Sequence, residues 1–154
     1  MSVLKCGTWP NNVADQGKHT FKYSIYPHAN DFRAGDTVKQ AMSFNQPFEF
    51  TEISANSNGK LNDTFSFVNV DKSNIVIDTI KQCEDDDSII IRMFECYNSS
   101  TDCQINFGVD IEKVEICDLM ENSFSQLEVN DQSVKLHFGN FEIITLKVRV
   151  KQKH

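Results

Sequence analysis

Apolar and polar residues alternate along several short stretches of the chain, the pattern of a β-strand with one face in a core and one in solvent. Four stretches share it: residues 19–26, 48–51, 134–138 and 144–150. In the first, Phe21, Tyr23 and Ile25 form the apolar face and the residues between them are polar. Each stretch is therefore expected to be a half-buried strand.

Two further stretches, residues 74–80 and 89–94, are apolar on both faces and rich in isoleucine. Both are too short for a typical helix, so they are expected to be central strands covered on two sides. The acidic residues 84–87 between them suit a hairpin connection. Weaker strands are expected at residues 65–70, 103–109 and 114–119.

A single helix is expected, over residues 35–44. Asp36 can cap its first turn, and Val38, Ala41 and Met42 share one face. Pro47 follows, and proline cannot continue a helix. Many strands and one short helix predict an all-β fold: a single antiparallel β-sandwich domain over residues 1–154.

Composition narrows the classes of function. The net charge of −7 makes a nucleic-acid partner unfavourable, because an acidic surface repels phosphates. No apolar run has the length of a membrane span, and the N-terminus lacks the apolar core of a signal peptide. The 5 cysteines, an odd number with no CxxC pair, favour reduced thiols and a cytoplasmic protein.

Motifs of catalysis and metal binding are missing from the sequence. It contains no HExxH, P-loop or GxSxG motif, and its 4 histidines are scattered. The acidic run at residues 84–87 lacks the spacing and glycine of a calcium loop, so a solvated loop is favoured there. Glycoside hydrolysis needs two carboxyl groups beside the scissile bond, and no pair can be assigned from the sequence.

One turn differs from this background. Tyr26, His28, Asp31 and Phe32 crowd together directly after an expected strand. Aromatic faces with hydrogen-bonding groups suit sugar recognition, whereas a rigid turn that packs on a core or on a neighbouring domain explains the same residues. These four residues are the candidates for a carbohydrate site or a domain interface, and the packing interpretation is preferred.

At this turn the sequence resembles the C-terminal region of glycoside hydrolase family 38 α-mannosidases, and most closely their cytosolic, vacuolar and bacterial branch. The resemblance extends in the same order through residues 15–28, 31–32, 41–47, 66–71, 74–81, 84–85, 89–92, 95–97 and 141–147. It thus covers nearly the whole chain. Asn30 lies where relatives tend to have glycine, and asparagine tolerates the left-handed conformation that such a turn needs.

The resemblance implies a β-sandwich of the galactose-mutarotase-like supersandwich type and a part in an α-mannosidase. Family members hydrolyse terminal non-reducing α-D-mannose with retention, using an aspartate nucleophile and zinc held by an N-terminal domain that a helical domain follows. None of these catalytic or zinc positions corresponds to a residue here. No cofactor is therefore expected in this chain, and its expected partners are the catalytic and helical domains and a mannose-containing oligosaccharide.

Three hypotheses of function remain. The first is a non-catalytic domain of an α-mannosidase, and the isolated chain is then inactive. The second is a stand-alone carbohydrate-binding module in which Trp9, Tyr26 and Phe32 stack on sugars. The third, an autonomous hydrolase, is disfavoured by the missing motifs.

Overall fold

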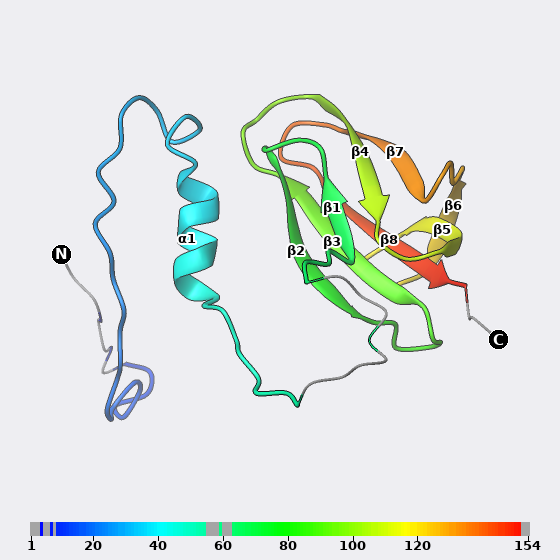
Figure 1. Ribbon diagram of the computed structural model, residues 1–154. Helices are drawn as coiled ribbons and strands as arrows, with labels where there is room; N and C mark the ends of the chain where they lie inside the picture. The colour runs from blue at the N-terminus through cyan, green and yellow to red at the C-terminus, as the bar shows by residue number, and fades with distance from the viewer. Residues whose placement is uncertain (1–3, 5–6, 8, 55–58, 60–62, 152–154) are drawn as a thin grey trace.

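The computed structural model describes residues 4, 7, 9–54, 59 and 63–151, and it places one helix and eight strands among them (Figure 1). In chain order these elements are α1 (Thr37–Asn45), β1 (Val68–Val70), β2 (Ile75–Gln82), β3 (Ile89–Glu95), β4 (Thr101–Phe107), β5 (Ile111–Cys117), β6 (Ser123–Leu127), β7 (Ser133–Phe138) and β8 (Ile143–Val150).

The strands form two sheets, and every pairing is antiparallel. One sheet has the order β1-β4-β7, and the other has the order β2-β3-β8-β5-β6. The sheets share one core, which both supply with buried side chains. The predicted antiparallel sandwich with one short helix is confirmed, whereas its assignment to the supersandwich type stays a prediction.

Alternation along β7 and β8 gives each strand a core face, as predicted. Val134, Leu136 and Phe138 are buried on β7, while Lys135 and His137 are exposed. On β8 the buried apolar residues are Ile144, Leu146 and Val148. Facing residues of β1 to β5 complete the core: Val68, Ile75, Ile91, Met93, Cys103, Ile105, Phe107, Ile111 and Val114.

The two stretches that are apolar on both faces have different places in the sheet. β3 is an inner strand, and Ile90 and Ile91 are both fully buried although they face opposite ways. β2 is an edge strand, so the prediction that it is central is wrong. Its residue Ile80 is 50% exposed. Ile77 and Phe94, which lie in the two stretches expected to be covered on both sides, are half-buried.

Two of the four alternating stretches are not strands. Residues 19–26 and 48–51 have no regular secondary structure and lie outside both sheets. Phe48 and Phe50 are 97% and 94% exposed, so the prediction of half-buried strands here is wrong for this chain. Alternation specifies which side chains share a face, but a strand forms only where a neighbour accepts its backbone hydrogen bonds. β6 was missed, because its residues are mostly polar and exposed.

The helix forms where it was predicted. α1 begins at Thr37, and Asp36 precedes it in a left-handed conformation (φ 51°) without a capping hydrogen bond from its side chain. It ends at Asn45, where the N–H of Gln46 donates to the carbonyl oxygen of Met42. With 9 residues it is short, and no helix in the described part of the chain is long and apolar enough to cross a bilayer.

Candidate interdomain surface

The turn at residues 26–32 brings its predicted side chains together. The rings of Tyr26 and His28 lie 5.5 Å apart, and the Tyr26 hydroxyl donates to the carbonyl oxygen of Gly35 at 3.0 Å. The close approach requires glycine, since a Cβ at Gly35 would lie 2.5 Å from Nδ1 of His28. Asn30 has a φ of 60°, which confirms the expected left-handed conformation.

Asp31 shapes the end of this turn. Its Oδ1 accepts hydrogen bonds from the N–H groups of Arg33 and Ala34, at 3.1 and 3.0 Å. The bond from Ala34 is the main reason that the pKa of Asp31 lies below its usual value. The carboxylate is therefore engaged in holding the backbone that leads into α1.

Phe32 and Tyr97 connect the turn to the sandwich. Their rings meet edge to face with centroids 6.0 Å apart. The Tyr97 hydroxyl donates to the carbonyl oxygen of Arg33 at 3.1 Å and to Oδ1 of Asp36 at 3.3 Å. Tyr97 lies just after β3, so the turn and α1 stand beside the β2–β3 side of the larger sheet (Figure 1).

A cavity of about 430 Å³ lies between α1 and the sheet. Val38, Ala41 and Met42 line it from the helix, as their predicted common face requires, and Asp78 and Phe94 line it from β2 and β3. α1 therefore turns its apolar side toward the sheet without closing on it.

The four candidates keep apolar surface in contact with solvent. Tyr26 is 46% exposed and Phe32 is 42% exposed, and His28 and Asp31 are also exposed. Most of their polar atoms are already bonded within the chain: His28 contacts the carbonyl oxygen of Ala29 through Nδ1 and Oγ1 of Thr37 through Nε2. The surface is therefore aromatic, with few polar atoms left for a ligand.

Behind this surface, Glu95 is a buried carboxylate at the end of β3, only 1% exposed. Its Oε1 accepts from Nδ2 of Asn74 at 2.9 Å and from the N–H of Tyr97 at 2.7 Å. Its Oε2 accepts from the N–H of Phe141 at 3.0 Å. Burial alone would raise the pKa of Glu95, but these hydrogen bonds outweigh it, so the pKa is lowered.

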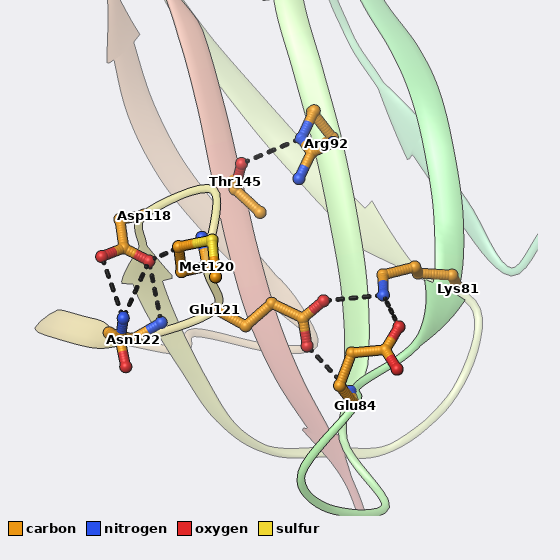
Figure 2. A network of polar contacts seen from close by, with 8 residues as sticks. All are labelled: Lys81, Glu84, Arg92, Asp118, Met120, Glu121, Asn122 and Thr145. Atoms are coloured by element: carbon orange, nitrogen blue, oxygen red, sulfur yellow. Dashed lines mark hydrogen bonds and ion pairs between the residues drawn. The ribbon is translucent and has the colours of Figure 1, made fainter.

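A second polar network covers the outer face of the larger sheet (Figure 2). The turn after β5 is held by Asp118, whose Oδ1 accepts from the N–H groups of Met120 and Asn122. Glu121, in that turn, contacts Nζ of Lys81 at 2.7 Å and accepts from the N–H of Glu84 at 2.8 Å. Glu84 and Asp118 directly follow Cys83 and Cys117, which form a small buried cluster with Ile90.

The acidic loop at residues 84–87 belongs to the same side of the sheet. Asp86 accepts from the N–H of Ser88 at 2.8 Å, and it contacts Nζ of Lys147 at 3.0 Å. Its carboxylate thus neutralises a lysine of the sheet. Within the described residues there is no group of three or more His, Cys, Asp or Glu side chains that would hold a metal ion.

Comparison with known proteins shows what the sandwich is similar to. Residues 74–146 match the sequence model described as "Glycosyl hydrolases family 38 C-terminal beta sandwich domain". Over these residues the sandwich resembles the family 38 C-terminal domain. The resemblance found in the sequence is therefore confirmed, and the matched residues extend from the start of β2 into β8.

Three α-mannosidases are similar to the chain along most of its length. Alpha-mannosidase 2C1 of Homo sapiens is 28% identical over 151 residues, which cover 95% of this chain and 14% of that protein. Alpha-mannosidase G of Dictyostelium discoideum is also 28% identical, over 96% of this chain and 14% of that protein. Alpha-mannosidase of Saccharomyces cerevisiae is 28% identical over 79% of this chain. The chain thus spans about one seventh of the length of these relatives.

The family 38 match contains the buried Glu95 network, whose role was not deduced from the sequence. A signal was present, because Ile91, Met93 and Glu95 are two residues apart along β3 and share its core face. A carboxylate at such a buried position needs hydrogen-bond donors around it. No comparable signal marks Glu121, which lies in a polar turn.

Acid should weaken the folding of this sandwich, in part through Glu121. The Lys81 ammonium and the N–H of Glu84 lower the pKa of Glu121 from 4.5 to about 2. A carboxylate whose pKa is lowered by folding stabilises the fold at pH values above its pKa in the unfolded chain. This contribution is lost as the pH falls toward the pKa of the carboxylate in the folded protein. We expect the thermal unfolding midpoint to drop between pH 4.5 and about 2, and to drop less in Glu121→Gln. Glu128 is exposed, so the unfolding midpoint of Glu128→Gln should depend on pH as that of the unaltered chain does. An equal pH dependence of the midpoint in all three proteins would contradict the role given to Glu121.

Proposed function

We propose that this chain is the non-catalytic C-terminal β domain of an α-mannosidase. In the longer polypeptide, terminal non-reducing α-D-mannose would be hydrolysed with retention, by residues outside this chain. The proposal is supported by the similarity to α-mannosidases of which the chain covers only a small part. It is also supported by Glu95, whose two carboxylate oxygens are occupied by backbone and asparagine donors and so do not face a substrate.

Zinc would be held by another domain of that polypeptide. Zinc sites need three or four His, Cys or carboxylate ligands that converge on one point. The described residues do not fit this requirement, because no such group gathers among them. This chain therefore contributes no step of metal-assisted chemistry in our proposal.

Tyr26, His28, Asp31 and Phe32 would face the catalytic and helical domains of the same enzyme. Their exposed aromatic surface and internally bonded polar atoms suit a domain interface better than a sugar site. We also infer that the enzyme is cytoplasmic. The buried free thiols of Cys83, Cys96, Cys103 and Cys117 suit a reducing compartment.

The carbohydrate-binding module is the second candidate, because Trp9 is 87% exposed and free to stack on a sugar. Stacking alone gives little selectivity, since sugar-binding sites also place polar groups around the ring. The hydroxyl of Tyr26 already donates to the carbonyl oxygen of Gly35, and the carboxylate of Asp31 already accepts from the N–H groups of Arg33 and Ala34. This observation favours the domain role.

A titration separates the two functions. We expect methyl α-D-mannoside to cause no saturable shift of the amide resonances of Trp9 or of residues 26–32 in the isolated chain. Methyl α-D-glucoside serves as the control for weak, unspecific sugar contacts. Saturable shifts with mannoside alone, at a Kd of about 1 mM or tighter, would contradict the domain role and establish the binding module.

A further inference from the structure

Two apolar segments of the chain lie outside the sandwich, and no strand of the described residues pairs with them. They are residues 19–26 and residues 48–51, which we call the two extended segments. In the first, Tyr23 is 71% exposed and Ile25 is 84% exposed. In the second, Phe48 and Phe50 are almost fully exposed. Single exposed apolar residues are ordinary, but regular alternation of exposed aromatic and branched residues is the pattern of a covered strand face.

The backbone of both segments is available for pairing. No backbone–backbone hydrogen bond between described residues involves positions 20–26 or 48–51. Their lengths lie within the usual range of strands, about 3–10 residues. An extended segment with unpaired N–H and C=O groups and one apolar face is suited to adding itself to the edge of a sheet.

The position of the segments indicates where that sheet belongs. The first segment ends at Tyr26, the first residue of the candidate interdomain surface, and the second follows α1. The segment before Tyr26 runs along the side of α1 that faces away from the sandwich (Figure 1). The edges of the two sheets in this chain are therefore not its neighbours. The similarity to the α-mannosidases covers 95% of the chain, so it includes these segments, while most of each relative lies outside the match.

We propose that both extended segments become β-strands by pairing with sheet edges in the remaining part of the longer α-mannosidase polypeptide. The apolar face of each added strand would then be buried in the core that this sheet covers. The inference rests on the proposed function, because it takes the partner from the same enzyme. It also explains why a strand pattern in the sequence has no strand in this chain alone: the partner strand is supplied by another domain.

Hydrogen exchange tests the pairing directly. Amide exchange is measured by mass spectrometry on the isolated chain and on the natural longer polypeptide that contains it. We expect peptides from the two extended segments to exchange at least about 100-fold more slowly in the longer polypeptide, because ladder hydrogen bonds protect amides. Peptides from β3 and β8 should be protected in both proteins and serve as the internal standard.

Matched substitutions test the predicted faces. Ile25→Asp and Phe50→Asp should abolish this protection in the longer polypeptide, whereas Ser24→Asp and Thr51→Asp, on the opposite faces, should retain it. All four variants should leave the protection of β3 unchanged in the isolated chain, because all four positions lie outside its sheets.

The outcomes separate this inference from the proposed function. Fast exchange of both segments in a longer polypeptide that hydrolyses an aryl α-mannoside would overturn the inference and leave the function intact. Protection that appears in the isolated chain and rises with its concentration would identify a second copy as the partner and also overturn it. A longer polypeptide without mannosidase activity would instead refute the proposed function.

Discussion

Glu95→Ala is expected to lower the free energy of unfolding of this chain by about 3–5 kcal/mol. The substitution removes the acceptor of three donors: Nδ2 of Asn74 and the N–H groups of Tyr97 and Phe141. A donor left without an acceptor costs about 1–3 kcal/mol when it is buried, and these three hydrogen bonds are buried or part-buried. Since a domain has only about 5–15 kcal/mol in total, much of the population should unfold under mild conditions.

Urea unfolding followed by far-ultraviolet circular dichroism measures this effect. Glu128→Ala is the control, because Glu128 is an exposed carboxylate outside the network. Glu95→Gln should lie between the two, since one amide oxygen can still accept while its NH₂ group faces a donor. If Glu95→Ala unfolded at the same urea concentration as Glu128→Ala, the network would not stabilise the fold.

Ile90→Ala should produce a loss of similar size, about 2–5 kcal/mol. Ile90 is fully buried on the outer face of β3, where it forms a small cluster with Cys83 and Cys117. Truncation leaves a cavity that this small cluster is poorly able to fill. The measurement is the same unfolding free energy in urea.

Ile80→Ala is the matched control, because Ile80 has the same side chain on the neighbouring strand β2 but is 50% exposed. Its loss should be well below that of Ile90→Ala, since exposed apolar atoms gain little from folding. Equal losses at the two positions would show that the outer face of β3 is not a covered core.

The strand pattern predicted those strands of the sandwich whose apolar faces are buried within this chain. Alternation in β7 and β8 and the apolar run of β3 specify buried faces, and the structure buries them. The pattern could not distinguish an edge strand from an inner one, which is why β2 was misplaced. It also could not show that residues 19–26 lack a partner, because pairing depends on residues far away in sequence.

The candidate surface was predictable in composition and less so in detail. The crowding of Tyr26, His28, Asp31 and Phe32 was evident from the sequence. Their attachment to Tyr97 was not evident, because Tyr97, whose hydroxyl donates to the carbonyl oxygen of Arg33, lies 64 residues further along the chain. The same limit applies to Glu121, which reaches Lys81 and Glu84 only through the fold of the turn after β5.

The most direct test of the central claim is a side-by-side assay of α-mannosidase activity. The isolated chain and the natural longer polypeptide that contains it are each purified and incubated with an aryl α-mannoside and zinc. If this chain is a non-catalytic domain, the longer polypeptide will hydrolyse the substrate and the isolated chain will not. Turnover that copurifies with the isolated chain and scales with its concentration would contradict the claim.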